Sequence, residues 1–174
     1  MGSGLSTLAA AEWAGGRLEA PWVRTLTIGG ETKRKLIGDF GADLVLSGVG
    51  AADTGKTLGA AGIKGSVAPS VWDVAGKIGA VTVGGTVGAT GQPWELKNAT
   101  ALASLTLGDV TDADVTVGGP IGTIRAKLWL DGTIQATKIT CIATTGVAAA
   151  RSTPAVSGEM VTLSRAACDA TRPA

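Results

Sequence analysis

The sequence contains no histidine and no tyrosine, and it has only one phenylalanine and two cysteines among its 174 residues. Without histidine the chain offers no imidazole general base, no Ser-His or Cys-His nucleophile pair and no imidazole metal ligand. Because aromatic residues make up 3% of the chain, a core must be filled largely by small and β-branched side chains, which pack well on pleated sheets. These shortages favour an all-β structural protein and argue against the common enzyme classes.

The chain also lacks an excess of charge of either sign. It has 15 basic and 14 acidic residues and a net charge of +1, so no strong field selects nucleic acid or an anionic membrane. No run approaches the roughly 20 apolar residues that span a bilayer, and the N-terminus lacks the basic and apolar segments of a signal peptide. We expect no nucleic-acid or membrane partner and no targeting signal within this chain. Its first residues, Met1 to Gly4, are typical of a cloning remnant.

What the sequence has in abundance is glycine, 27 residues, together with three short apolar patterns that recur in a fixed order. The first is Gly-polar-apolar, the second is apolar-polar-apolar, and the third is apolar-x-x-apolar followed by a polar and then a small or apolar residue. Examples of the first lie at 38–40, 65–67, 85–87 and 108–110, of the second at 44–46, 72–74, 94–96 and 115–117, and of the third at 23–28, 78–83 and 102–107. Self-similarity of this kind indicates a repeat architecture.

Each pattern predicts one short strand, because alternation with period 2 places the outer residues of a triplet on one side. Three short strands per coil of roughly 20–25 residues predict a single-stranded parallel β-helix, or β-solenoid, whose coils stack about 4.8 Å apart. We expect about six right-handed coils over residues 13–146. In the second coil an insertion stretches the third pattern between Leu58 and Ile63. A β-sandwich, which also uses short strands and glycine turns, is the alternative fold.

The two ends of the sequence, residues 1–12 and 147–174, depart from the repeat. We expect them to form caps or tails, because the uncovered end of a sheet presents unpaired backbone groups to other molecules. End-to-end or side-by-side association with copies of the same chain is therefore an expected partnership.

The repeat units at 38–48, 77–85 and 120–126 resemble repeats in large cell-surface or secreted proteins of environmental bacteria such as planctomycetes. In that family such units form β-helix stalks without an assigned activity. The resemblance covers roughly residues 13–146. It implies an extracellular or cell-surface location for the parent protein and a structural role, and it transfers no catalytic residue.

One segment satisfies the P-loop motif G-x-x-x-x-G-K-[ST], with Gly50, Gly55, Lys56 and Thr57 at the defining positions. A working P-loop must open a helix whose N-terminal amides face the phosphates. The eight residues after Thr57 include three glycines, which makes a poor helix. We interpret the segment as a glycine-rich insertion at a coil corner, and nucleotide binding is a secondary alternative.

Four acidic residues are further candidates for chemistry. Asp73 and Glu95 are expected on adjacent coils of one outward face, and carboxylates about 5 Å apart are what a retaining glycosidase uses. With Trp22 as an exposed aromatic, they form a candidate carbohydrate face, which makes polysaccharide a candidate partner. Asp112 and Asp114 lie in a corner loop and are candidate calcium ligands, although two carboxylates fall short of a full cage. A solvated turn is the alternative interpretation.

The two cysteines can serve in two ways. Cys141 is expected in the inward position that Ile28, Val83 and Leu107 hold in other coils, where it would act as a small buried hydrophobe. A disulfide bridge from Cys141 to Cys168 would instead attach the C-terminal tail to the repeats. Four tryptophans are also expected in the core, namely Trp13, Trp72, Trp94 and Trp129.

These features rank the functional hypotheses. A non-enzymatic structural module that serves as spacer, stalk or assembly unit, without a cofactor or metal, agrees best with uninterrupted apolar patterns and scattered polar residues. A carbohydrate-binding or carbohydrate-cleaving β-helix is the first alternative. P-loop nucleotide binding is the second.

Overall fold

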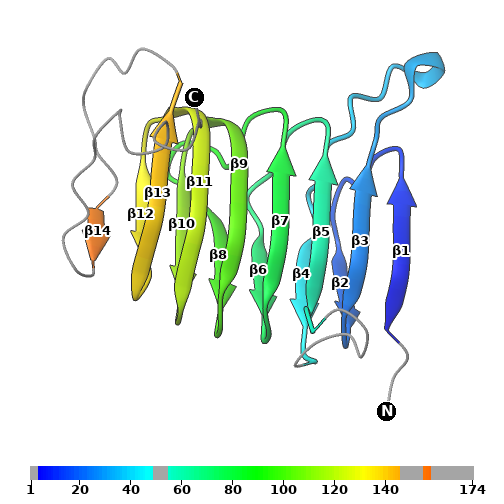
Figure 1. The fold of residues 1–174 in the computed structure, drawn as a ribbon. Coiled ribbons are helices and arrows are strands. Elements are labelled where there is room, and N and C mark those ends of the chain that lie inside the picture. Colours follow the sequence, from blue (N-terminus) through cyan, green and yellow to red (C-terminus); the bar gives the residue numbers. More distant parts are fainter. Residues whose placement is uncertain (1–3, 49–54, 146–154, 158–174) are drawn as a thin grey trace, which may run out of the picture.

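A computed structural model of the chain describes residues 4–48, 55–145 and 155–157 (Figure 1). Short strands dominate it, as the β-branched residues and the period-2 alternation predict. The strands are β1 (Leu5–Ala10), β2 (Arg17–Ala20), β3 (Val23–Ile28), β4 (Asp43–Leu46), β5 (Leu58–Ile63), β6 (Val71–Val74), β7 (Ile78–Val83), β8 (Trp94–Asn98), β9 (Leu102–Val110), β10 (Ala113–Val117), β11 (Pro120–Trp129), β12 (Gly132–Gln135), β13 (Lys138–Thr144) and β14 (Ala155–Ser157). A short 3-10 helix, η1 (Thr32–Arg34), follows β3.

The strands alternate between two parallel sheets. The odd-numbered strands β1 to β13 form sheet A, and the even-numbered strands β2 to β14 form sheet B, each in sequence order. Figure 1 shows sheet B as a layer behind sheet A. One strand from each sheet, with the corners between them, makes up one repeat, and each repeat pairs with the next. The expectation of an all-β chain with parallel strands is confirmed.

The first sequence pattern does not form a third strand in the early repeats, contrary to our expectation. There it contributes one bridging residue per repeat, because the chain turns directly after it. These residues nevertheless stand in a ladder of parallel bridges, in the order Trp13, Phe40, Val67, Val87 and Val110. In the later repeats β9 and β11 continue through this position without a break, so that Val110 and Trp129 pair within sheet A.

The register of both sheets stacks side chains of similar kind over one another. One inward column of sheet A contains Leu8, Leu26, Ala61, Val81, Leu105, Ile124 and Ile142. The corresponding column of sheet B contains Leu18, Leu44, Trp72, Leu96, Val115 and Ile134. These columns meet in a single core between the sheets. Burial of each large apolar side chain there contributes roughly 1.5–3 kcal/mol.

Tryptophans lie in this core as the repeat pattern predicted. Trp72 and Trp94 are fully buried and Trp129 is 8% exposed, whereas Trp13 is only partly buried at the N-terminal end. The rings of Trp13, Phe40, Trp72 and Trp94 make successive edge-to-face contacts, with centroids 5.2–6.0 Å apart. Such contacts add about 0.5–1.5 kcal/mol each beyond area burial.

The expected insertion in the second coil is absent from β5. Leu58 pairs with Val23 and Ile63 pairs with Ile28, so β5 has the same length and spacing as β3. The irregularity is one of side-chain size, because Ala61 stands opposite Leu26. A small residue at the central apolar position had concealed a regular repeat.

Candidate functional site

Carboxylates at the corners bind the backbone of the following repeat. Asp39 accepts a hydrogen bond on Oδ1 from the amide of Ser66 at 2.7 Å. Asp43 accepts one on Oδ1 from the amide of Val71 at 2.8 Å. Both carboxylates are half-buried. Because hydrogen bonds to a charged acceptor are roughly twice as strong as neutral ones, each carboxylate helps to fix the position of one repeat on the next.

Asn98 is one of the few buried polar residues, 5% exposed. Its Nδ2 donates to the carbonyls of Val74, at 2.9 Å, and of Gly76. Its Oδ1 accepts from the amide of Thr100 at 3.1 Å. The side chain therefore satisfies two carbonyls of the preceding repeat and one amide of its own corner, which is a structural task.

Asp73 and Glu95 lie on neighbouring strands of one outward face, as predicted, but they do not stand directly opposite each other. The register of β6 and β8 places Asp73 opposite Lys97, while Glu95 stands opposite Val71. Glu95 Oε2 and Lys97 Nζ form an ion pair at 2.5 Å, and the hydrogen bond and charge of Glu95 raise the pKa of Lys97. Asp73 and Glu95 are thus not the cross-strand carboxylate pair that a retaining glycosidase requires.

A shift of two residues explains this error. Trp72 aligns with Leu96 and not with Trp94, and Trp94 aligns with Ala113. An offset of two keeps every side chain on its own face, so the apolar pattern alone did not distinguish the two registers. The length of the preceding turn, which the bridge between Ala89 and Gln92 closes, sets where β8 begins.

Trp22, the third residue of that candidate face, packs at the N-terminal end of the stack. Its ring lies over Gly4, where a β-carbon would overlap the indole. Its carbonyl accepts a hydrogen bond from the amide of Leu5 at 2.8 Å, and the residue is half-buried. Strand β4 separates β6, which carries Asp73, from β2. The structure therefore does not gather the three residues into one site.

The P-loop candidate lacks the helix that its chemistry needs. Gly50 lies outside the described residues, while Gly55, Lys56 and Thr57 lead directly into strand β5. Thr57 is fully buried, and its hydroxyl donates to the carbonyl of Gly48 at 2.6 Å. The hydroxyl that would bind magnesium in a P-loop instead holds the chain at a corner.

The calcium candidates Asp112 and Asp114 are accompanied by a third carboxylate, Asp131. Asp114 Oδ1 accepts from the amide and the hydroxyl of Thr133, at 3.0 and 2.7 Å. Asp131 Oδ1 accepts from the amide of Gly132 at 2.8 Å. Within the described part of the chain, no group of three or more acidic or cysteine side chains has a geometry that could hold a metal ion. Asp114 lies within β10 and not in the corner loop that we expected, and Asp114 and Asp131 bind the first two residues of β12.

Asp112 has an altered acidity that gives a testable pH dependence. Burial, followed by the charges of Asp131 and Asp114, raises the pKa of Asp112 against a hydrogen bond from Gly91. A carboxyl whose pKa is raised by folding stabilises the fold when protonated, and this stability is lost as the pH rises through the folded pKa. At neutral pH the ionised Asp112 therefore costs stability.

We accordingly expect Asp112→Asn to be more stable than the parent at pH 7. The difference should vanish below about pH 3.9, the ordinary aspartate value, where both states of the parent are protonated. Urea unfolding across a pH series measures the effect. Asp109→Asn, at an exposed strand position, controls for the loss of one negative charge. A less stable Asp112→Asn protein at pH 7 would contradict the assignment.

Cys141 does not occupy the inward position predicted for it. It aligns with Thr123 and is half-buried, while Thr144 takes the position next to Ala126 that continues the Leu107 column. The register differs from our prediction by three residues, because Ile139 and Ile142 fill the two apolar positions of the third pattern.

The sulfur of Cys141 is disulfide-bonded. The chain has only one other cysteine, Cys168, which lies outside the described residues. Of the two interpretations of Cys141, the disulfide and not the buried free thiol is therefore correct. Whether the bond also fixes the C-terminal tail in place stays a prediction.

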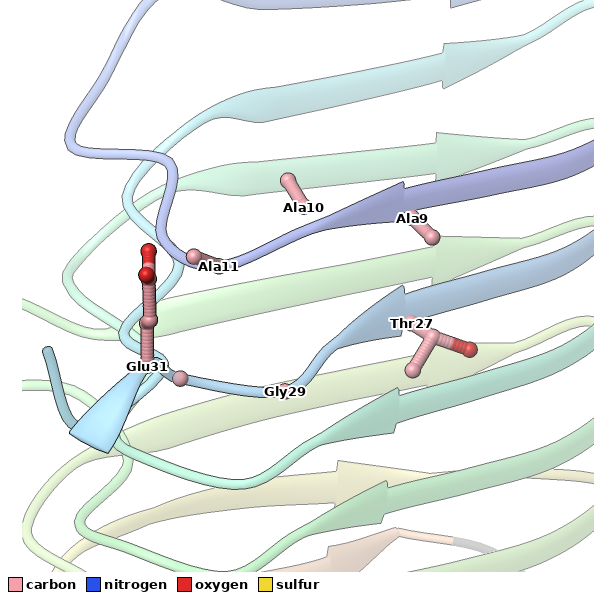
Figure 2. Close-up of a pocket in the computed structure, with 7 residues that line it drawn as sticks. Ala9, Ala10, Ala11, Thr27, Gly29 and Glu31 are labelled. Carbon is pink, nitrogen blue, oxygen red and sulfur yellow. The ribbon is translucent and has the colours of Figure 1, made fainter. Parts of the chain in front are cut away.

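A hollow of about 400 Å³ lies at the edge of sheet A near the N-terminus (Figure 2). It is lined by residues 9–11, Thr27 and 29–31. Figure 2 shows the carboxylate of Glu31 at one end of the hollow, near Ala11, and the hydroxyl of Thr27 at the other end, near Ala9. Glu31 Oε2 lies 3.4 Å from Arg34 Nε. One ion-paired carboxylate above alanine and glycine provides no acid–base pair.

Comparisons with known proteins identify no relative of this chain. Across the described residues, no helix has the length and apolar character needed to cross a membrane. No family model matches the chain, and neither the curated proteins nor the solved structures include a match to it.

Proposed function

We propose that the chain is a parallel β-solenoid, right-handed, that serves as a non-enzymatic structural module such as a spacer, a stalk or an assembly unit. The observation that supports this proposal best is the use made of the polar side chains. Asp39, Asp43, Asn98 and Asp114 each bind backbone groups 19 to 28 residues away, in a neighbouring repeat. Polar side chains that could otherwise bind a ligand or take part in catalysis instead hold successive repeats in register.

The dimensions suit a short rigid spacer. Seven strands at about 4.8 Å spacing span about 30 Å along the stack. Because each repeat contacts only its neighbours, such a module can be lengthened by adding repeats without changing its cross-section. A stalk or spacer needs this property.

The proposed location is extracellular or at the cell surface. The disulfide bond of Cys141 supports an oxidising compartment, because disulfides are rare in proteins of the reducing cytosol. The resemblance of the repeats to those of large bacterial surface proteins supports the same location. Polysaccharide is kept as a ligand to be tested.

A spin-label distance measurement tests this proposal. Thr27 and Arg125 lie in one outward column of sheet A, four strand spacings apart through Gly62, Thr82 and Thr106. Nitroxide labels on the double variant Thr27→Cys, Arg125→Cys, diluted with an excess of unlabelled chain so that only the two labels of one molecule are measured, should give one narrow distance distribution near 19 Å, apart from the length of the labels. Adding polysaccharides should leave the distribution unchanged.

Two results would overturn the proposal. A broad or multiple distance distribution would exclude a rigid stack in this register. Hydrolysis of any member of a polysaccharide panel, lost in both Asp73→Ala and Glu95→Ala, would show an enzyme instead. The matched control is Asp109→Ala, an exposed carboxylate on sheet A, whose removal should not alter such activity.

A further inference from the structure

The N-terminal end of the stack is an open surface. Strands β1 and β2 are the end strands of sheets A and B, and the described residues place no strand on their outer sides. Figure 1 shows them together at the end that carries the N-terminus. The core-facing side chains of this repeat are only partly buried, namely Leu5, Leu8, Ala10, Trp13, Leu18 and Ala20. Their neighbours Val23, Leu26 and Ile28 are fully covered.

Two residues of β2 direct their backbone hydrogen-bonding groups toward the open side of the strand. The carbonyls of Gly16 and Ala20 accept hydrogen bonds from Asp43 and Ser47, so they face β4. Backbone groups alternate sides along a strand. Arg17 and Glu19 therefore direct their N–H and C=O groups outward, away from β4.

The side chains of the same two residues carry opposite charges. Arg17 Nη2 lies 2.6 Å from Glu19 Oε1, and the two side chains are 58% and 61% exposed. Strand β1, which ends the other sheet, contains neither a charged residue nor a proline, although such residues commonly protect exposed strand edges. This end is therefore suited to pairing with another strand edge.

The opposite end of the stack is engaged by the chain itself. Strand β14 pairs with β12 and extends sheet B. The two ends therefore differ, and a head-to-tail polymer would have to compete with the chain's own C-terminal segment. A contact between two N-terminal ends has no such competitor among the described residues.

We propose that two copies of the chain bind head to head through this end, related by a two-fold axis through Leu18. The axis sets β2 antiparallel to its copy and places Arg17 opposite the partner's Glu19, and Glu19 opposite the partner's Arg17. Both residues present edge-facing backbone groups, so each pair exchanges two hydrogen bonds. Opposite charges directly across an antiparallel pair attract. The contact is isologous and closes at the dimer.

Charge reversal tests the proposed register of the two β2 strands in the dimer. The dimer proposal rests on the proposed structural role of the chain. The full chain should sediment as a dimer whose dissociation is concentration-dependent. Arg17→Glu places like charges opposite each other at two sites and should weaken the dimer about tenfold or more. Adding Glu19→Arg to that variant should restore dimerisation. Lys97→Glu, which breaks the equivalent ion pair of the interior strand β8, should leave the dimer unchanged.

A crosslink provides the second, independent measurement. In the proposed register Leu18 faces its own copy as a non-hydrogen-bonded pair, with Cα atoms about 4.5 Å apart, within the range of a disulfide. Leu18→Cys should therefore form an intermolecular disulfide under mild oxidation, whereas Val45→Cys on β4 should not.

Three results would overturn the inference: a parent chain that stays monomeric over the micromolar range, a dimer that Arg17→Glu does not weaken, or a mass that grows without limit. A monomer with the narrow spin-label distance would reject the dimer and keep the spacer. A broad distance would reject the spacer itself.

Discussion

Replacement of Trp72 by alanine should lower the free energy of unfolding by about 3–5 kcal/mol. Trp72 is fully buried in the middle of the stack. Its ring contacts Phe40 and Trp94 edge to face, with centroids 5.5 and 5.2 Å apart. Truncation removes both contacts and leaves a cavity between repeats that are fixed by their backbone ladders and cannot close around it. Equilibrium unfolding in urea measures the loss.

Two further variants show whether the loss comes from packing. Ile37→Ala, at a side chain that is 64% exposed, should change stability by less than about 0.5 kcal/mol. Trp72→Phe should cost less than Trp72→Ala, because a ring remains and a buried indole N–H with no acceptor in the described part of the chain is removed. Equal losses for the alanine and phenylalanine variants would contradict the role assigned to the ring.

Gly88→Ala should destabilise the protein by about 2–5 kcal/mol, for two separable reasons. Gly88 has a φ of +70°, in the left-handed region where a side chain costs roughly 1–2 kcal/mol. A β-carbon there would also overlap the carbonyl oxygen of Asp112 and lie 3.2 Å from the amide nitrogen of Trp94. Gly88 thus lets two successive corners approach closely.

Gly91→Ala is the matched control, because it shares the backbone conformation but not the contact. Its φ is +68°, and a β-carbon there would meet no atom within 4 Å. It should therefore show only the conformational cost, about 1–2 kcal/mol. Thermal or urea unfolding of both variants separates strain from overlap. A Gly91→Ala loss as large as that of Gly88→Ala would show that the close approach at residue 88 is not tight.

Much of the architecture could be predicted from residue patterns. The triplet Leu44-Val45-Leu46 and the motif from Ile78 to Val83 identify strands and their inward faces, and the structure buries those faces as predicted. Period-2 alternation suffices for this, because burial of one face stabilises a strand whatever its partner is. The inward tryptophans followed from the same periodicity.

Which residues stand opposite each other on neighbouring strands could not be predicted in the same way. An offset of two residues separates the expected neighbour of Asp73, Glu95, from the observed one, Lys97, and both offsets bury the same faces. At Cys141 the predicted register is wrong by three residues. Ala136, Ile139 and Ile142 are apolar and three residues apart, so the apolar pattern fits either register. Corner lengths and side-chain volumes decide between such registers, and both act only when repeats stack.

The P-loop letters illustrate the same division. The sequence by itself determined that the residues from Gly55 to Thr57 form a glycine-rich corner that is poorly suited to begin a helix. Only the tertiary structure decided that the hydroxyl of Thr57 binds the carbonyl of Gly48. Whether a segment forms a strand, and which of its faces is buried, follow from the spacing of its own apolar residues, because both depend only on that segment and the solvent. Register, ion pairs and hydrogen-bond partners depend on two segments, and these meet only in the folded chain.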